Sequence, residues 1–408
     1  MNLKNSLYKV SPTPFLKEIL LPTSKSHSNR ALIIGATRGN GFRVDNLATS
    51  TDVNTMLSCL EAVGIKLIRN QDSVTFLNSF PACEVETSKD VIDLKTGDGG
   101  TTNRFLLALL SRGQKTYRFF PSEKMSERPI DDLLYPLKEL NVKIENNKNE
   151  AWVELTGPAQ MDHTKKIVID CKVSTQFASA MLLSFSNHEF EIELKNIRAS
   201  ETYITMTKAI LTMTKNANSF LVPVDFSCLS YPVAFALLNG SVLIKNCLSL
   251  DPLQADGAFI ELMQNAGGDI EWTPNGLRAS SKNTLSSFSV DGAQFPDLIP
   301  TLAFMAAHIE GESVLSNLSV LRHKESDRIE EILSILKNLG IDFQFIPNRD
   351  EIRIQGKIER NPEVTLVTAR DHRMVMTGYL FLRKNSGGWL AHSDCVEKSF
   401  PDFFKLME

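Results

Sequence analysis

Six clusters of small polar and charged residues, each running directly into an apolar stretch of helical length, limit what this chain can fold into. The clusters begin at Ser24, Gly99, Ser174, Asp225, Phe295 and Asp371. Their starts fall roughly 50 to 75 residues apart, a recurrence that indicates internal repeats. A helix N-terminus exposes unpaired backbone N–H groups and the positive end of the helix dipole. Several such ends with Lys and Arg attached predict a site for small anions.

A second, amphipathic helix is expected after each apolar one, because apolar residues then recur every three or four positions until a Gly or Asn. The clearest examples span residues 51–63, 129–140, 254–266 and 326–339, and less regular ones start near Tyr203 and Ser399. Short β-type stretches follow at 65–68, 142–144 and 341–345. Six such units predict an α/β fold of two lobes with three units each, divided near residues 221–225. The residues before 19 fit either lobe.

Composition excludes several classes of protein. The 408 residues are enough for two or three domains with cores of their own. The net charge of −4 argues against general nucleic-acid binding, so the cations of an anion site must be concentrated locally. No apolar run is long enough to cross a bilayer, and the N-terminus lacks the core of a signal peptide. The six cysteines without C-x-x-C spacing indicate reduced thiols in a cytoplasmic protein, and the seven scattered histidines predict no metal site.

The first cluster is the densest in groups that bind anions. Thr23 or Ser24 can cap the helix, Lys25 then lies in its first turn, and Arg30 follows one to two turns later. Hydroxyl, ammonium and guanidinium groups together suit a phosphate or a carboxylate. A capped surface helix with solvated charges fits the same residues. The glycine-rich segment 97–104 allows close backbone approach to a ligand, but it lacks the ending of a P-loop and alone also fits a plain turn.

Three further segments carry charge next to a predicted helix. Arg128 precedes the helix that Pro129 starts, where a lone Arg is usually solvated. Residues 324–328 alternate in sign, which also fits a surface ion-pair face. Asp371-His372-Arg373 opens an apolar helix, so an acid, an imidazole and a guanidinium must find partners beside a buried segment.

Taken together, nine segments resemble the 5-enolpyruvylshikimate-3-phosphate (EPSP) synthase family. In order from Leu21 to Phe403 they are LPTSKSHSNRAL, GDGGTTNRFL, SERPI, VSTQF, SETYITMT, FPDLIPTLAF, LRHKESDRI, DHRMVM and KSFPDFF. The resemblance implies a two-lobed inside-out α/β barrel, each lobe built from three βαβαββ units with buried helices. It implies that residues 19–222 form one lobe, on the shikimate 3-phosphate side. Residues 1–18 and 223–408 form the other, with the phosphoenolpyruvate side and the acid–base residues.

The resemblance also implies a reaction and its residues. The enolpyruvyl group of phosphoenolpyruvate moves to the 5-hydroxyl of shikimate 3-phosphate by addition and elimination through a tetrahedral intermediate, which releases phosphate in aromatic amino-acid biosynthesis. The residues expected to bind shikimate 3-phosphate are Lys25, Ser26, Arg30, Ser174, Thr175, Gln176, Ser200, Tyr203, Asp297 and Lys324. Those expected to bind phosphoenolpyruvate are Lys25, Gly100, Arg128, Gln176, Arg328, Arg373 and Lys398.

The catalytic residues expected from the resemblance are Asp297 at the hydroxyl and Glu325 at the methylene carbon, with Lys25 assisting. No cofactor, metal, nucleic acid or membrane is expected to take part. The protein is expected to be a cytoplasmic monomer whose lobes close on the two substrates, because closure aligns them and excludes water.

Several residues depart from the family pattern. The usual Asn-Ala-Gly-Thr loop reads Asp98-Gly99-Gly100-Thr101, the following Arg-Pro reads Arg104-Phe105, and Val320 replaces an Asn. We expect these changes to alter affinities, including that for the analogue glyphosate, without loss of the chemistry.

Two alternatives stay open. A sister enolpyruvyl transferase that acts on UDP-N-acetylglucosamine usually has Lys-Asn in place of Lys25-Ser26, and usually has a Cys on a mobile loop, whereas no Cys lies between Cys83 and Cys171. A non-catalytic anion-binding relative is the second alternative. It is disfavoured by the presence of Lys25, Asp297, Glu325 and Lys398.

Overall fold

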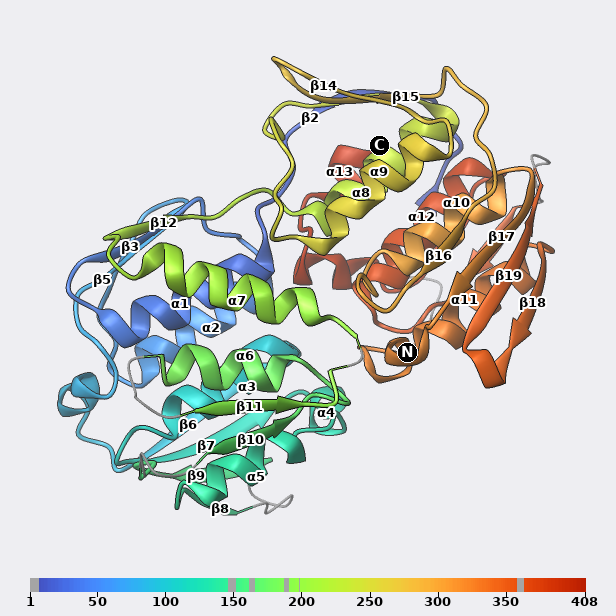
Figure 1. The fold of residues 1–408 in the computed structure, drawn as a ribbon. Coiled ribbons are helices and arrows are strands. Elements are labelled where there is room, and N and C mark those ends of the chain that lie inside the picture. Colours follow the sequence, from blue (N-terminus) through green and yellow to red (C-terminus); the bar gives the residue numbers. More distant parts are fainter. Residues whose placement is uncertain (1–6, 146–151, 161–165, 187–190, 198, 358–362) are drawn as a thin grey trace. The chain divides into compact units, whose positions relative to one another are not determined.

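The computed structural model describes residues 7–145, 152–160, 166–186, 191–197, 199–357 and 363–408. The chain forms two compact units (Figure 1). Unit 1 comprises Met1–Pro22 and Val224–Glu408, and unit 2 comprises Thr23–Pro223. The limits expected from the sequence lie after residues 18 and 222. Residues 1–6 of the expected N-terminal segment lie outside the described residues.

Unit 2 combines helices with three sheets. Its helices are α1 (Lys25–Arg38), α2 (Thr51–Ala62), η2 (Ala82–Glu86), α3 (Gly100–Leu110), α4 (Glu123–Ser126), α5 (Asp131–Glu139), α6 (Gln176–Ser184) and α7 (Glu201–Thr214). One sheet has the order β12 (Ser219–Leu221), β3 (Phe42–Asp45), β5 (Ser73–Phe76) and β4 (Leu67–Arg69). The second has the order β6 (Val91–Gly97), β7 (Thr116–Pro121), β9 (Val153–Thr156) and β8 (Lys143–Glu145). β10 (Ile167–Asp170) and β11 (Ile192–Lys195) form the third.

Unit 1 repeats this arrangement. Its helices are α8 (Phe226–Asn239), η3 (Ala255–Gly257), α9 (Ala258–Asn265), α10 (Ile299–His308), η4 (Ser319–His323), α11 (Arg328–Asn338), η5 (Pro347–Arg349), α12 (His372–Lys384), η6 (Ser393–Lys398) and α13 (Phe403–Met407). One sheet has the order β14 (Asp269–Thr273), β15 (Gly276–Ser280), β13 (Gly240–Ile244) and β2 (Phe15–Ile19). The second has the order β16 (Ser289–Asp291), β17 (Gly311–Ser316), β19 (Glu351–Gly356) and β18 (Asp342–Ile346). The third has the order β1 (Tyr8–Val10), β21 (Gly388–Leu390) and β20 (Val364–Leu366).

The apolar helices serve as crossovers between parallel strands, which cannot be joined by a tight turn. α3 connects β6 to β7 and α6 connects β10 to β11 in unit 2. α10 connects β16 to β17 and α12 connects β20 to β21 in unit 1. A helix that is covered on every side must be apolar around its whole circumference. Every residue of α8 from Phe226 to Leu237 is buried, which fits that requirement.

β2 and β12 each pair with a strand that is distant in the sequence but belongs to the same unit. β2 precedes α1 in the chain, yet it pairs in parallel with β13, which follows α8. β12 precedes α8, yet it pairs in parallel with β3, which follows α1. The chain therefore passes between the units twice, and its N-terminal residues belong to the same unit as its C-terminal half.

Hydrogen bonds at the two crossings explain where the units divide. The side-chain amide of Asn246 accepts from the backbone N–H of Leu21 at 2.9 Å and donates to the carbonyl of the same residue at 2.8 Å. The carbonyl of Pro22 accepts from the N–H of Asp225 at 3.0 Å. These bonds hold residues 20–22 to unit 1, so the division comes later than residue 18. The carbonyl of Pro223 instead accepts from the backbone N–H of Ser24, the residue that caps α1, at 2.8 Å. This bond lies within unit 2.

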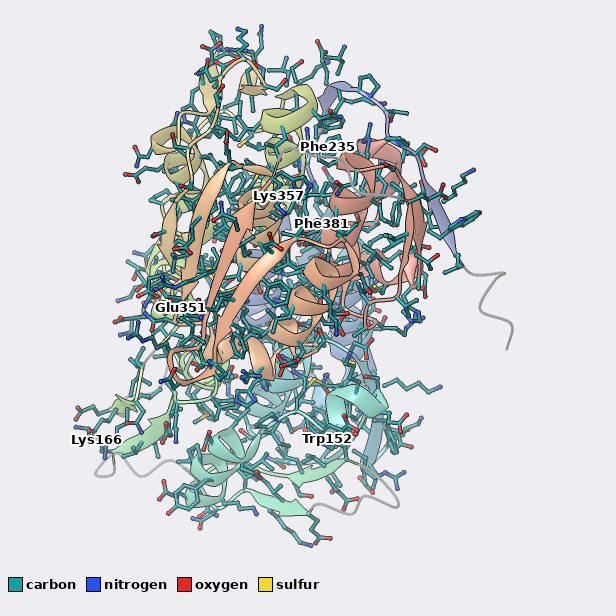
Figure 2. The ribbon with its side chains drawn as sticks, turned by 90° about the vertical axis from the view of Figure 1, so that its right-hand side faces the viewer. Trp152, Lys166, Phe235, Glu351, Lys357 and Phe381 are labelled. Carbon is teal, nitrogen blue, oxygen red and sulfur yellow. The ribbon has the colours of Figure 1, made fainter. Side chains whose placement is uncertain are left out.

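The core of each unit is formed by its three buried helices. α1, α3 and α6 pack on one another in unit 2, and α8, α10 and α12 do so in unit 1. In unit 1 the ring of Phe304 lies 5.3 Å from that of Phe381 and 6.5 Å from that of Phe235. Phe235 and Phe381 are both buried (Figure 2). Within the described residues, no helix combines the length and apolar character that crossing a membrane requires.

Candidate active site

The six polar clusters of the sequence all lie at the starts of buried helices, as predicted. α1 begins at Lys25, α3 at Gly100, α6 at Gln176, α8 at Phe226, α10 at Ile299 and α12 at His372. Three of these helices have a side-chain cap that the sequence pattern favours, from Ser24, Asp225 and Asp371. Such a cap stabilises a helix by about 1 kcal/mol.

In unit 1, Arg328 is the centre of a network of ion pairs. Its side chain is 1% exposed and stands at the start of α11. Nη1 lies 2.7 Å from Oδ1 of Asp297, and Nη2 lies 2.8 Å from Oε2 of Glu325. Nε lies 2.8 Å from Oδ2 of Asp371, which is fully buried. Burial alone would lower the pKa of Arg328, but the three carboxylates outweigh it and raise the pKa above its usual value.

Asp297, which precedes α10, has two further cationic neighbours. Nη2 of Arg373 donates to Oδ2 of Asp297 at 3.0 Å, and Nζ of Lys324 lies 3.9 Å from Oδ1. Burial alone would raise the pKa of this carboxyl. The charges of Arg373, Lys324 and Arg328 outweigh burial and hold the pKa well below its usual range. Asp297 is therefore an ionised carboxylate held by cations.

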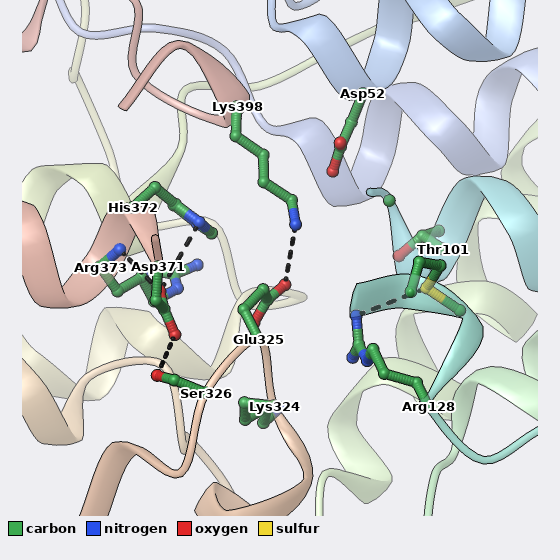
Figure 3. A network of polar contacts seen from close by, with 12 residues as sticks. Asp52, Thr101, Arg128, Lys324, Glu325, Ser326, Asp371, His372, Arg373 and Lys398 are labelled. Atoms are coloured by element: carbon green, nitrogen blue, oxygen red, sulfur yellow. Dashed lines mark hydrogen bonds and ion pairs between the residues drawn. The ribbon is translucent and has the colours of Figure 1, made fainter. Parts of the chain in front are cut away.

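Glu325 links the network to a residue from the end of the chain. Nζ of Lys398 lies 3.5 Å from Oε1 of Glu325 (Figure 3). Oε2 of Glu325 faces Arg328. The structure thus brings together all six residues of unit 1 that the sequence singled out: Asp297, Lys324, Glu325, Arg328, Arg373 and Lys398.

Asp371 is a member of the network that the set of expected binding residues did not contain. Its Oδ1 caps α12 through the N–H of Arg373 at 2.9 Å, and its Oδ2 accepts from the hydroxyl of Ser326 at 3.1 Å (Figure 3). It thereby orients the guanidinium of Arg328 and caps the helix that carries Arg373. The position of an acid immediately before an apolar helix was the available signal.

In unit 2, Arg30 is a buried cation without a carboxylate. Its side chain bonds to the hydroxyls of Thr207 at 2.8 Å and Ser179 at 3.4 Å, and to the carbonyls of Ser26 at 2.8 Å and Tyr203 at 3.2 Å. Among the described residues, none of its partners is an anion. Burial lowers its pKa to about 10, with Tyr203 acting in the opposite direction.

The ring of Phe105 lies 5.6 Å from the Arg30 guanidinium, and that of Tyr203 lies 5.7 Å from it. Attraction between a desolvated cation and an aromatic face contributes about 2 kcal/mol. The departure from Pro at position 105 therefore supplies a contact to Arg30.

Lys25, at the start of α1, forms an ion pair with a residue that the sequence analysis did not select. Its Nζ lies 3.0 Å from Oδ2 of Asp52, whose side chain is 6% exposed in the first turn of α2. The backbone carbonyl of Asp52 accepts from the hydroxyl of Thr102 at 3.2 Å. An acid in a first helical turn is too common to mark such a partner from sequence alone.

Gly100 and Arg128 are adjacent in the structure. A Cβ atom on Gly100 would lie 2.7 Å from Nη1 of Arg128, so a larger residue here would displace the guanidinium. Gln176 lies at the start of α6 and donates to the hydroxyl of Thr101 at 3.2 Å. Its Oε1 accepts from Arg104 at 2.7 Å. The glycine-rich segment and the third cluster therefore share one hydrogen-bond network.

The remaining expected residues of unit 2 form a second group. The hydroxyl of Thr175 donates to the carbonyl of Ser200 at 3.2 Å, and that of Ser174 accepts from the N–H of Gln176 at 3.3 Å. Ser200 has a φ of +59° at the N-cap of α7, and Tyr203 lies in the first turn of that helix. Within unit 2, Arg30 contacts Ser26 and Tyr203, and Thr175 contacts Ser200.

Val320, a position where the family pattern has Asn, lies in η4. In the described part of the chain, no three His, Cys, Asp or Glu side chains are grouped so that they could hold a metal ion.

Comparison with known proteins gives one consistent result. The family model described as EPSP synthase (3-phosphoshikimate 1-carboxyvinyltransferase) matches residues 11–217 and again residues 212–407. A 3-phosphoshikimate 1-carboxyvinyltransferase from Haemophilus ducreyi is 29% identical over 433 residues, which cover 99% of this chain and 98% of that protein. One from Syntrophobacter fumaroxidans is 28% identical over 412 residues, covering 96% of each.

Solved structures show the same fold. An EPSP synthase structure from Acinetobacter baumannii superposes with a TM-score of 0.77 at 21% identity, and covers 98% of this chain and 97% of that chain. The mixed α/β architecture of two repeated units is therefore shared with it.

Proposed function

This chain belongs to the EPSP synthase family, and on that premise we propose how its residues catalyse the family reaction. The reaction transfers the enolpyruvyl group of phosphoenolpyruvate to the 5-hydroxyl of shikimate 3-phosphate and releases phosphate. Both substrates carry a phosphate and a carboxylate, so their mutual repulsion must be overcome by fixed cations.

Phosphoenolpyruvate binds Arg328, Arg373 and Lys398 of unit 1. Together with Lys324, these cations stand around Asp297 and Glu325 at 2.7–3.9 Å. From unit 2, the proposed binding residues are Lys25, Gly100, Arg128 and Gln176. Gly100 lies against the Arg128 guanidinium, so an anion that binds Arg128 would also lie near the Gly100 backbone.

Asp297 is the base that removes the hydroxyl proton. Its depressed pKa makes it a weak base while it holds Arg328 and Arg373 by itself. A general base works best with a pKa near the working pH. An incoming phosphoenolpyruvate anion shares those arginines and therefore raises the pKa of Asp297. Substrate binding and activation of the base are then one event.

Glu325 is the acid that protonates the methylene carbon, and it later removes the proton for elimination. Its two oxygens face Lys398 and Arg328, so the side chain is held in one orientation. Lys25 assists, with its ammonium group fixed by Asp52. Positioned acid–base groups typically contribute ~10²–10⁴-fold in rate.

Shikimate 3-phosphate binds in unit 2 through Arg30, with Lys25, Ser26, Ser174, Thr175, Gln176, Ser200 and Tyr203 as further partners. The buried Arg30 has four neutral acceptors and no anion among the described residues. A buried charge without a counterion is costly, and a bound carboxylate or phosphate would supply that counterion. Asp297 and Lys324 complete the proposed set.

One observation carries the proposal. Asp297 and Glu325 bind the same guanidinium group, through Nη1 and Nη2 of Arg328. The proposed base and the proposed acid thus belong to one cation cluster in which an anionic substrate can bind.

The test is a phosphate-release assay with phosphoenolpyruvate and one of two acceptors. Shikimate 3-phosphate should support turnover, and UDP-N-acetylglucosamine should not. Turnover with the second acceptor alone would favour the sister transferase, and none with either would favour a non-catalytic relative.

Glu325→Gln should lower kcat by about 10²–10⁴-fold while shikimate 3-phosphate still binds. Glu330→Gln is the matched control, because Glu330 lies in the first turn of α11, which Glu325 precedes, but is 65% exposed. Near-normal turnover of Glu325→Gln would reject the role in proton transfer.

The proposal further includes a cytoplasmic monomer that needs no metal or other cofactor. Light scattering at assay concentration tests the monomer, and turnover after exhaustive chelation tests the metal independence.

A further inference from the structure

Asp256 is a buried acid in unit 1 that the mechanism above does not use. It lies in η3 and is 3% exposed. Its Oδ2 accepts a hydrogen bond from the hydroxyl of Ser227, and its Oδ1 is buried without a donor among the described residues. No Lys, Arg or His of the described chain forms an ion pair with it. A buried carboxyl in such surroundings favours the protonated form.

The groups that face Asp256 come from three other elements. Ser227 lies on α8 and Asp225 caps that helix, Asp297 precedes α10, and Arg373 lies on α12. Burial is the largest cause of its raised pKa, and the charges of Asp297 and Asp225 add to it. Arg373 and the Ser227 hydroxyl act in the opposite direction, and the balance places the pKa at about 7.

Arg373 has spare hydrogen-bonding capacity on its own guanidinium. Nη2 is bound to Asp297 at 3.0 Å, whereas Nη1 is buried without an acceptor among the described residues. Phosphoenolpyruvate brings at least two negative charges to this network. Within the network, the carboxylates of Asp297, Glu325 and Asp371 already balance three of the four cations, which are Lys324, Arg328, Arg373 and Lys398. An ionised Asp256 would add a negative charge that opposes the incoming anion.

We propose that Asp256 takes up a proton from solvent when phosphoenolpyruvate binds unit 1, and so removes a negative charge near Arg373 that would oppose the substrate. The carboxylate oxygen gains one proton from the buffer, and the acid returns it when the anionic product leaves. Asp256 is in this sense a positioning residue, because it acts through Arg373. The inference rests on the proposed function.

The experiment titrates phosphoenolpyruvate alone into the full chain, without acceptor, so that no turnover occurs. Calorimetry at pH 7.5 in buffers of different protonation enthalpy gives the number of protons taken up. Wild type should take up about three quarters of a proton more than Asp256→Asn, as a pKa of about 7 requires. Protonation of the ligand itself contributes equally to both proteins.

Affinity provides the second readout. At pH 8 the wild-type Kd should exceed that of Asp256→Asn by about tenfold, because the side-chain amide of the variant cannot ionise. At pH 6 the two should agree.

Two variants test whether the effect is specific. Ser227→Ala removes a hydrogen bond to the ionised form, so it should reduce the uptake at pH 7.5 without removing the carboxyl. Asp342→Asn changes a 67% exposed carboxylate and should match wild type.

Equal proton uptake by wild type and Asp256→Asn, with normal turnover of wild type, would overturn the inference and leave the proposed function intact. If Asp256→Asn does not fold, unchanged uptake by Ser227→Ala is the overturning result. Turnover absent while the uptake difference persists would overturn only the proposed function. No binding of phosphoenolpyruvate to wild type in the absence of acceptor, with normal turnover when acceptor is added, would overturn only the inference.

Discussion

The buried acid Asp256 should make the protein less stable as the pH rises. Its pKa is about 7 in the folded protein, against 3.8 for the exposed group. Each unit of difference corresponds to about 1.4 kcal/mol, so the whole shift amounts to about 4 kcal/mol. Below pH 4 the carboxyl is protonated in both the folded and the unfolded chain and has no effect. Between pH 4 and 7 only the unfolded chain releases the proton, so the folded state loses stability with rising pH.

Asp256→Asn should remove this loss. The amide keeps an oxygen that can accept from Ser227 and carries no charge at any pH. Urea unfolding at pH 5, 6, 7 and 8 should show the variant gaining on wild type by about 2 to 3 kcal/mol over that range. Asp342→Asn, at an exposed carboxylate, should track wild type throughout.

A constant difference between wild type and Asp256→Asn from pH 5 to 8 would refute the reasoning, because an acid that is ionised throughout gives no slope. A difference that shrinks with rising pH would mean that cations dominate its surroundings. Neither result depends on the proposed function, since no substrate is present in the measurement.

Three further outcomes follow from the network and the crossings. Arg328→Met should lower the free energy of unfolding by about 3–5 kcal/mol in urea at pH 7.5, because it leaves the fully buried Asp371 without its cation; a loss below about 1 kcal/mol would contradict the pairing. Arg30→Met should lower the affinity for shikimate 3-phosphate at least about 100-fold in calorimetry. The free energy of unfolding should stay within about 1 kcal/mol of wild type, because the substitution removes an uncompensated buried cation. Normal affinity would argue against the proposed site. Asn246→Ala should cost about 2 kcal/mol by leaving both backbone groups of Leu21 unpaired, and Asn246→Asp, which retains one acceptor, should cost less by the same measurement.

The helices were predictable because their signals are local. Each buried helix starts at a polar cluster, some of them with a side-chain cap as at Ser24 and Asp371, and the caps fix the first residue of the helix. Amphipathic helices ended where Gly or Asn interrupts the pattern. The segment 129–140 contains α5, which spans Asp131–Glu139 and has no side-chain cap at its N-terminus.

Strand pairing was not predictable from the sequence. β2 is five residues long, and its pattern is the same whether it pairs within the first repeat or with β13, 225 residues later. From its own residues the N-terminal segment therefore fitted either lobe, and only the family resemblance placed residues 1–18 with residues 223–408. The hydrogen bonds from Asn246 to Leu21 hold the first crossing to unit 1, but no pattern in the local sequence indicates them.

Membership of the charged network was partly predictable. Lys324, Glu325 and Arg328 occur in one segment, so the sequence shows that charges of both signs are crowded together. Which carboxylate meets which arginine depends on how α10, α11 and α12 pack. Asp256 was missed because a single acid near a short helix resembles any surface residue, and only burial by other elements changes its pKa.

The network is better explained by function than by stability. Taking Arg328 and Asp371 out of water costs several kcal/mol for each ion, and well-packed apolar side chains of similar size are often as stable or more so. A chain selected for stability alone could continue the apolar surface of α12 at this position. It instead buries an arginine that contacts three carboxylates, and leaves Nη1 of Arg373 without an acceptor among the described residues. Such a group gains a partner when an anion arrives. Replacing Arg373 by Met should therefore abolish phosphoenolpyruvate binding, and it should also lower the free energy of unfolding, because Asp297 loses one of its cations.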